Sequence, residues 1–442
     1  MIFRIFALSI LVSLAACSKP TELVVVGEES GNLAALRDSG VLDKFEAETG
    51  TKVELVGLSF EELQENVNLD FELGSGRFDI VLNYNFALAP YVEADWIVPL
   101  DELKSLSPGG WEDIQASLFR NHWLEVGHYS SSGSPEAVAL PFAANTMLLA
   151  YNKSLFDDPK FQTSFKEQFD RTFSPPATWA EFRDIAQFFS RQDGLKGVAL
   201  QGASDGWLYY EFVNYLFGLG GAVYDKTYGW ETASPDALRL TSEASVDAAA
   251  FFLNLKPYNA GDFFSVGANE QVELLARGRA TMGIVWSDYA QQIVSAARRS
   301  GYEIAFSPIP GEKSMLAGGS AFVNDDSQDP EVAAKFIKYL LKPEVQRKLI
   351  KLGYQSPLEA AYQTDAEDLP AYATAVEASL ERGIYMNEAG PDAGVISTAI
   401  TDAIQIAWRE FDPAEDSARS VAEKAMADAQ ETTIDRLEKL RR

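Results

Sequence analysis

Apolar stretches of strand length alternate with amphipathic, helix-like stretches through the first part of the chain. Strand candidates lie at residues 23–27, 52–56 and 78–82, which are rich in Val, Ile and Leu. The stretch after the first strand places Val41 and Phe45 on one helical face and ends at Gly50, a residue type that suits a helix C-cap. The stretch after the second opens with a capping-box pattern from Ser59 to Glu62. This alternation predicts a parallel or mostly parallel sheet flanked by helices.

The same alternation continues further along the chain. A second capping-box pattern, Thr178 to Glu181, opens an amphipathic helix. We expect strands at 147–150, at 197–201 and before Trp286, and a helix over 111–123. Further helices are expected to begin at Pro330 and at Pro343, and the chain beyond 362 reads as helical, with a closing amphipathic helix over 423–442. A length of 442 residues allows two or three domains, or two larger lobes.

Residues 140–156 stand out because a polar pair interrupts an apolar run. Pro141 fixes φ and lacks a backbone donor, which favours a crossing point over a central strand. The polar pair Asn145-Thr146 follows, and then a short buried-strand candidate at 147–150. The sequence therefore predicts two short strands separated by the polar pair Asn145-Thr146.

The N-terminal residues have the pattern of a signal peptide. Arg4 precedes a short apolar run, and Leu14-Ala15-Ala16 places small residues before Cys17. This apolar run is shorter than a membrane-spanning helix requires. The sequence Leu-Ala-Ala-Cys resembles a bacterial lipoprotein box, which implies cleavage after residue 16 and acylation of Cys17. Cys17 is the only cysteine, so an intrachain disulfide is excluded, and a free thiol or intermolecular pairing is the alternative.

The charge balance is strongly acidic, with 65 Asp and Glu against 37 Lys and Arg and a formal net charge of −28. Such a field repels nucleic acid, so we expect no nucleic-acid partner.

Several patterns that carry enzyme chemistry are incomplete. Gly202-x-Ser204-x-Gly206 matches a nucleophile elbow, but His122 and His128 are the only histidines and both precede the serine, so the hydrolase mechanism lacks its base. The two histidines are also off the spacing that would place them on one helical face, and we expect no bound metal and no cofactor. The sequence does not exclude a catalytic pair of carboxylates for glycoside hydrolysis, because two of the 65 acidic residues can come together by chance.

A set of motifs, in order along the chain, resembles the family 1 extracellular solute-binding proteins, the carbohydrate-binding branch that serves ABC importers. The motifs are Tyr151-Asn152-Lys153 with Leu155-Phe156, residues 175–182 (PPATWAEF), residues 275–286, Gly318-Gly319, residues 329–336 and residues 343–346. The resemblance covers the mature chain to about Tyr362 and implies the maltose-binding-protein-like architecture. This is an α/β fold with two lobes, each a mostly parallel sheet flanked by helices, and a cleft between them.

The expected organisation follows from that resemblance. Residues 1–16 form the signal peptide and 17–22 the lipid-anchored tether. Lobe 1 comprises 23–141 and 308–360, and lobe 2 comprises 142–307 and 361–442. The chain is expected to cross first at 140–156 and to return at 304–310.

The candidate binding residues are aromatic and polar side chains at strand ends. Sugars present weakly polar C–H faces and a rim of hydroxyls, so aromatic rings bury the face while amides and carboxylates satisfy the rim. The ends of strands in α/β sheets are where ligands gather, which makes the loop 28–32 a site candidate. The resemblance also places a ligand-stacking Trp at Trp286. The predicted ligand-binding residues are Trp286, Asn145, Tyr84, Asp288, Asn83, Glu28, Trp207, Tyr210 and Gly319.

The resemblance, together with the lipoprotein-like N-terminus, thus implies a monomeric, lipid-anchored receptor outside the cytoplasm of a bacterium. It is expected to capture a carbohydrate or polyol, without chemistry, and to deliver it to the permease subunits of an ABC transporter. A secreted glycoside hydrolase and a receptor of the same fold for a peptide, a polyamine or a phosphate ester are the alternatives. Removing Trp286 is expected to abolish binding with little loss of stability.

Overall fold

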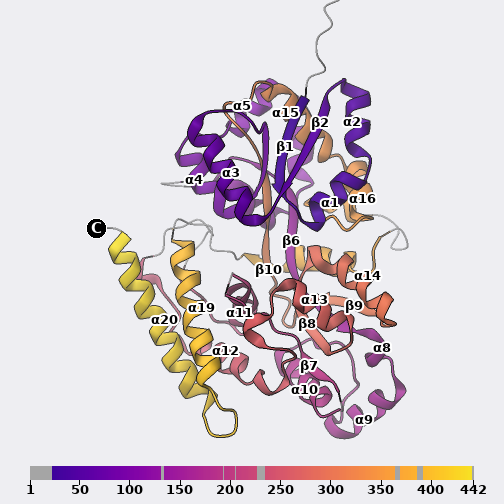
Figure 1. Cartoon of the computed structure of the whole chain (residues 1–442), viewed down its shortest axis with the longest axis vertical. Helices are drawn as coiled ribbons and strands as arrows, with labels where there is room; N and C mark the ends of the chain where they lie inside the picture. Colours follow the sequence, from indigo (N-terminus) through magenta and orange to yellow (C-terminus); the bar gives the residue numbers. More distant parts are fainter. Residues whose placement is uncertain are drawn as a thin grey trace, which may run out of the picture.

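Two lobes are joined by two long neighbouring strands (Figure 1). The computed structural model describes residues 22–130, 134–192, 194–204, 206–225, 234–363, 369–385 and 392–440. Lobe 1 is built around β1 (Glu22–Glu28), β2 (Lys52–Leu58) and β3 (Ile80–Tyr84), and lobe 2 around β7 (Lys196–Val198), β8 (Ala280–Trp286) and β9 (Ile304–Pro308). The joining strands, β6 (Leu140–Asn152) and β10 (Met315–Val323), pair with each other in antiparallel register.

The remaining elements follow the chain in three groups. Before β6 the chain forms α1 (Gly31–Asp38), α2 (Val41–Thr49), α3 (Phe60–Leu73), η1 (Asn85–Ala87), α4 (Leu88–Glu93), α5 (Leu100–Leu106), α6 (Trp111–Ala116), α7 (Arg120–Gly127), β4 (His128–Tyr129) and β5 (Glu136–Ala137). Between β6 and β10 lie α8 (Lys153–Phe156), α9 (Pro159–Phe169), α10 (Trp179–Ser190), α11 (Trp207–Gly218), η2 (Pro235–Ala237), α12 (Glu243–Leu253), η3 (Lys256–Tyr258), η4 (Phe263–Ser265), α13 (Ala268–Ala276), η5 (Ser287–Tyr289) and α14 (Ala290–Ser300). After β10 come α15 (Pro330–Leu340), α16 (Pro343–Ile350), α17 (Glu359–Tyr362), α18 (Ala373–Arg382), β11 (Ile384–Tyr385), α19 (Ala393–Glu410) and α20 (Ala418–Leu440).

One mixed sheet runs through both lobes in the order β2-β1-β3-β10-β6-β8-β7, with β11 on β10 and β9 on β6. The pairs β1–β2, β1–β3 and β7–β8 are parallel, as the alternating pattern predicts. The joining strands are antiparallel to each other and to β3, β8 and β9, whereas β11 pairs with β10 in parallel register. Residues 140–146 of β6 pair with β10, and residues 147–152 pair with β8 and β9. A single strand therefore belongs to both lobes.

Local signals in the sequence account for several helix ends. The capping boxes at Ser59 and Thr178 both form, each with the hydroxyl accepting from the backbone N–H of the glutamate three residues later. Gly50 and Gly74 end α2 and α3 in the left-handed conformation, with φ of 75° and 57°. That conformation is costly for a residue with a Cβ, so glycine ends these helices cleanly.

Three predictions about the strands and helices are wrong. The segment 140–152 is one continuous strand, which tolerates Pro141 because the β6–β10 register shifts between Gly319 and Ser320, opposite the proline. The return crossing is β10 and not 304–310, since β9 pairs with β6 inside lobe 2. The two glycines in β10 weaken its strand signal. The helix expected over 111–123 is split into α6 and α7, and Leu118 between them bridges to Leu358.

Apolar side chains fill both lobes. In lobe 2, α10, α11 and α12 pack around Phe182, Phe212 and Phe252, all fully buried. The long helices α19 and α20 lie side by side along one flank of lobe 2 and contribute Ile400 and Met426 to the same core (Figure 1). Burial on this scale holds the strand ends of lobe 2 in fixed positions.

Candidate functional site

A chain of hydrogen bonds links the two lobes beside the joining strand β6. Asn32, near the start of α1 in lobe 1, donates from Nδ2 to Oδ1 of Asn145 at 3.1 Å. Asn145, in β6, donates from its own Nδ2 to Oδ2 of Asp288 at 3.2 Å. Asp288 lies in η5, directly after β8 of lobe 2. The amide of Asn145 thus contacts both lobes at once.

The backbones of the two lobes also meet at this point. A Cβ on Gly31 would lie 2.9 Å from the carbonyl oxygen of Asp288, which is closer than real Cβ contacts allow. Figure 1 shows α1 at the lower edge of lobe 1 and α14, the helix that follows η5, at the upper edge of lobe 2. The absence of a side chain on Gly31 is therefore what lets the lobes approach this closely.

Glu28 and Tyr84 form a second polar group on the lobe 1 side. Glu28 is the last residue of β1, Tyr84 is the last residue of β3, and the Tyr84 hydroxyl donates to Oε2 of Glu28. Burial raises the pKa of Glu28, the hydrogen bond from Tyr84 lowers it and the charge of Glu61 raises it, with a net increase. Burial and the negative charge of Glu28 both raise the pKa of the Tyr84 hydroxyl. This pair lies where ends of parallel strands meet, as the sequence predicts.

Asp288 faces this pair from lobe 2. Burial, and then the charge of Glu28, raise the pKa of Asp288 to about 7, while the hydrogen bond from Asn145 opposes the increase. Its Oδ1 atom is buried and has no hydrogen-bond partner among the described residues. The next residue, Tyr289, has its hydroxyl pKa raised by burial, by Asp288 and by Glu28. Four side chains from two lobes, Glu28, Tyr84, Asp288 and Tyr289, are thus close enough to act on one another electrostatically.

Aromatic rings lie beside this group in lobe 2. Trp286 is the last residue of β8 and is 8% exposed. Its ring and that of Tyr210 pack edge to face, with centroids 5.4 Å apart and planes at 75°. Tyr210 and the half-buried Trp207 come from the first turn of α11. The burial of Trp286 argues against the expectation that removing it would cost little stability.

Two predicted residues have other contacts. The amide of Asn83 is fully buried, where its Nδ2 donates to Tyr91 at 2.7 Å and it exchanges hydrogen bonds with Gln64. Gly319 lies in β10, where a Cβ would come within 2.4 Å of the Asn83 carbonyl oxygen. Both residues therefore serve the packing of lobe 1. Cys17 lies outside the described residues.

Sequence reasoning missed Tyr289 and Gln355, and it gave Asn32 only as a member of the candidate loop 28–32. The loop 28–32 was expected to be part of a site, but its strand-end position gives no sign that Asn32 reaches β6. The Oδ1 atom of Asn32 also accepts from the backbone N–H of Gln355 at 2.9 Å. A contact across 323 positions of the sequence leaves no local signal.

A carboxyl group with a strongly raised pKa lies within the core of lobe 2. Glu211, in α11, is fully buried, and the Tyr215 hydroxyl donates to its Oε1 at 3.0 Å. Burial raises the pKa of Glu211 to about 8. The folded chain therefore holds a proton here that the unfolded chain releases above the ordinary pKa of 4.5.

The contribution of Glu211 to stability is expected to fall as pH rises through this range. Below about pH 6.5 the buried His122 acts in the opposite direction, because burial lowers its pKa to about 4 and only the unfolded chain then binds a proton there. Between about pH 5 and 8 the folded state binds one more proton at Glu211 than the unfolded state does, so each pH unit costs about 1.4 kcal/mol at this residue. Asp288 adds to the slope up to about pH 7. Urea unfolding at pH 5.5, 6.5 and 7.5 measures the slope, and Glu211→Gln is expected to reduce it. A slope that is unchanged in Glu211→Gln would contradict the assignment, and Glu415→Gln, at an exposed carboxyl, is the control.

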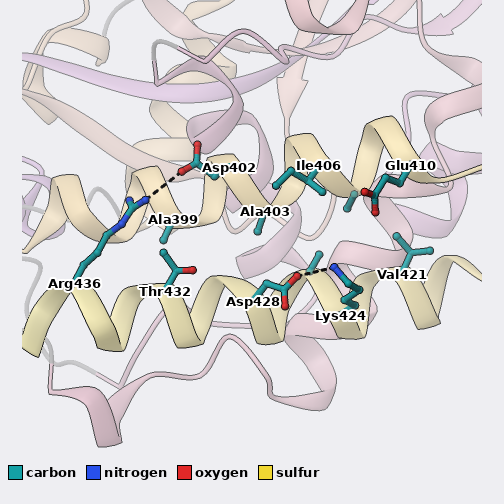
Figure 2. Close-up of a pocket in the computed structure, with 12 residues that line it drawn as sticks. Ala399, Asp402, Ala403, Ile406, Glu410, Val421, Lys424, Asp428, Thr432 and Arg436 are labelled. Carbon is teal, nitrogen blue, oxygen red and sulfur yellow. Dashed lines mark hydrogen bonds and ion pairs between the residues drawn. The ribbon is translucent and has the colours of Figure 1, made fainter.

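A surface groove lies between α19 and α20, away from these residues (Figure 2). It has a volume of about 250 Å³ and is bordered by the ion pairs Arg436–Asp402 and Lys424–Asp428. The predicted binding residues do not line it.

Within the described ranges, no group of three or more His, Cys, Asp and Glu side chains is arranged to hold a metal ion. None of the helices in this part of the chain is long and apolar enough to cross a membrane.

Comparisons with known proteins agree on the family. The family model described as bacterial extracellular solute-binding protein matches residues 31–347. The probable amino-acid ABC transporter periplasmic-binding protein y4oP of Sinorhizobium fredii is 22% identical over 70% of this chain and 66% of its own length. The putrescine-binding periplasmic protein SpuD of Pseudomonas aeruginosa is 24% identical over 70% of this chain and 71% of its own. The sn-glycerol-3-phosphate-binding periplasmic protein UgpB of Escherichia coli is 26% identical, and the chain spans only about half of its length, 53%.

Solved structures show the same fold. Maltose-bound MalE3 of Thermotoga maritima superposes with a TM-score of 0.72 at 18% identity, covering 93% of this chain and 99% of that one. A ribitol-bound ABC transporter solute-binding protein of Agrobacterium radiobacter superposes with a TM-score of 0.70 at 18% identity, over 93% of this chain and 98% of the other. These likenesses confirm the two-lobed solute-binding architecture. Because the family model covers most of the chain, this protein belongs to the bacterial extracellular solute-binding protein family.

Proposed function

We propose that this protein is the receptor of an ABC importer and that it captures a carbohydrate or polyol between its lobes. The family and the fold are those of transport receptors that work outside the cytoplasm. The observation that carries the proposal is the hydrogen-bonded chain from Asn32 through Asn145 to Asp288, which joins both lobes at the strand ends. A ligand that engages these groups would contact both lobes together.

The chemistry of the neighbouring side chains supports a polyhydroxyl ligand. Trp286 and Tyr210 offer ring surfaces for weakly polar C–H groups, and Tyr84, Asp288 and Glu28 offer acceptors and donors for hydroxyls. Structures of the same fold hold ribitol, maltose and D-mannitol. Three relatives are named for amino acids, putrescine and glycerol phosphate, so these solutes are the alternatives to a sugar or polyol.

The proposed organisation follows the sequence predictions. Lobe 1 is assigned residues 23–141 and, because the chain returns along β10 and not at 304–310, the residues from β10 to 360; lobe 2 is assigned residues 142–314 and 361–442. Residues 1–16 are the signal peptide, and acylated Cys17 anchors the mature chain to the membrane surface, where the permease subunits receive the ligand. The pairing of β6 with both lobes supports a hinge at the joining strands.

A thermal-shift screen tests the proposal. The mature chain is heated with monosaccharides, disaccharides, oligosaccharides, polyols, putrescine, amino acids and glycerol 3-phosphate. A ligand present at 100 times its Kd stabilises the folded state by about 2.7 kcal/mol, which a melting curve resolves. We expect a sugar or a polyol to raise the Tm and to be recovered unchanged by chromatography. A shift with putrescine, amino acids or glycerol 3-phosphate alone would overturn the proposal, and release of smaller sugars would indicate a glycoside hydrolase instead.

A further inference from the structure

A pair of buried hydroxyl groups ties the two joining strands to each other where they enter lobe 2. Thr146 of β6 and Ser314, the residue before β10, are fully buried, and their hydroxyl oxygens lie 2.8 Å apart. The Thr146 hydroxyl also contacts the carbonyl oxygen of Met315 at 3.0 Å, and the Ser314 hydroxyl contacts that of Met147. Because each hydroxyl carries one proton, two of these three contacts are hydrogen bonds at any time. Each of the three joins β6 to the start of β10, so every choice links the strands.

The same point is bonded to the wall of lobe 2 that carries the proposed binding residues. The backbone N–H of Thr146 donates at 3.1 Å to Oγ of Ser287, the fully buried first residue of η5. The backbone N–H of Met315 donates at 3.4 Å to Oδ1 of Asn214 in α11. Asn214 is fully buried too, and its Nδ2 donates to the carbonyl oxygen of Tyr210 at 2.6 Å. Both joining strands are therefore attached to lobe 2 through buried polar groups, which hold a fixed arrangement while all of their partners are present.

Lobe 1 holds the joining strands only two residues away. In β6, the backbone N–H of Ala144 donates to the carbonyl oxygen of Gln355, which follows α16, at 2.9 Å. In β10, the carbonyl oxygen of Ala317 accepts from Nε2 of the fully buried His122 in α7 at 2.9 Å. One residue of each strand thus separates the contacts to lobe 1 from those to lobe 2. These residues are Asn145 in β6 and Leu316 in β10.

From these contacts we infer that Thr146, Ser314 and Asn214 are positioning residues. They hold the ends of the joining strands and the binding wall of lobe 2 as one unit, so that the lobes rotate about Asn145 and Leu316. Bending the strands on the lobe 2 side would instead leave buried polar groups without partners, which costs free energy. The position of this pivot does not depend on the solute, and only its part in capture rests on the proposed function.

Distances between spin labels on the two lobes test the inference without any solute. The mature chain carries Cys17→Ser and two label sites, Lys348→Cys in α16 of lobe 1 and Arg299→Cys in α14 of lobe 2, both at exposed positions (Figure 1). Double electron–electron resonance measures the distribution of distances between the labels. We expect Thr146→Val, which removes the hydroxyl and keeps the shape of the side chain, to broaden this distribution. Thr146→Ser keeps the hydroxyl and is expected to preserve the native distribution.

Thr281→Val is the matched control, because Thr281 is a fully buried threonine of β8 whose hydroxyl donates to the carbonyl oxygen of Lys196 at 3.1 Å. It is expected to lower the melting temperature as Thr146→Val does and to leave the distances unchanged. Ser314→Ala removes the same link from the other strand and decides the question if Thr146→Val does not fold. Native distributions in Thr146→Val and Ser314→Ala would overturn the inference, and so would an equal broadening in Thr281→Val. Because no solute is added, neither result depends on whether a sugar or polyol is the ligand.

Discussion

Gly31→Val is expected to weaken ligand binding at least tenfold, which corresponds to about 1.4 kcal/mol. Even a single Cβ at this position would lie 2.9 Å from the Asp288 carbonyl oxygen, and valine adds two methyl groups to it. The backbone of η5 cannot move aside cheaply, because β8 and α14 hold it on both sides. The variant therefore disfavours the arrangement in which the lobes touch, and a ligand must overcome that penalty.

The measurement is a calorimetric Kd for the ligand that the thermal-shift screen identifies. Gly394→Ala is the control, since Gly394 lies early in α19 and no heavy atom lies within 4 Å of its added Cβ. The apo melting temperature is expected to change little in either variant. An unchanged Kd in Gly31→Val would show that the contact between α1 and η5 does not matter for binding.

Trp286→Ala is expected to destabilise the folded state by about 3–5 kcal/mol, the usual cost of truncating a buried aromatic residue to alanine. Trp286 is 8% exposed, ends the central strand β8 and packs against Tyr210. The truncation leaves a cavity at the wall of lobe 2 that faces the junction. Urea unfolding followed by circular dichroism measures the loss.

Phe60→Ala provides the comparison, because Phe60 is an aromatic residue that is 41% exposed, and its truncation is expected to cost much less. A loss below about 1 kcal/mol in Trp286→Ala would contradict the packing described for this ring. Trp286→Phe retains a ring in the core, so it separates binding from folding. If it folds well and binds the ligand as tightly as the native chain, the indole is structural only.

Local signals in the sequence predicted the parts of the fold that depend on neighbouring residues. The capping boxes at Ser59 and Thr178 and the glycine stop at Gly50 need only a few positions to be recognised, and all three are present in the structure. The alternation of strands and helices likewise yielded the parallel strands of each lobe. The crossing strand β10 escaped detection, because Gly318 and Gly319 interrupt its apolar pattern and its partners lie far away in the sequence.

In the candidate site, too, the sequence predicted what depends on neighbouring residues and not what depends on the packing of distant ones. Strand-end reasoning led to Glu28, Tyr84 and Asp288. In the structure the Tyr84 hydroxyl donates to Glu28, and Asp288 accepts from Asn145. Strand-end reasoning did not separate them from Asn83, whose side chain points to the Gln64 and Tyr91 contacts of lobe 1 while that of its neighbour Tyr84 meets Glu28. Adjacent strand residues face opposite sides of a sheet, and which side faces the other lobe is decided by the packing of the whole chain.

Small-angle scattering of the mature chain, with and without saturating ligand, tests most directly whether capture closes the two lobes. The radius of gyration is expected to fall when the ligand binds, and to fall less in Gly31→Val at the same fractional saturation. Scattering curves that superpose while calorimetry reports full saturation would contradict closure of the lobes over the ligand.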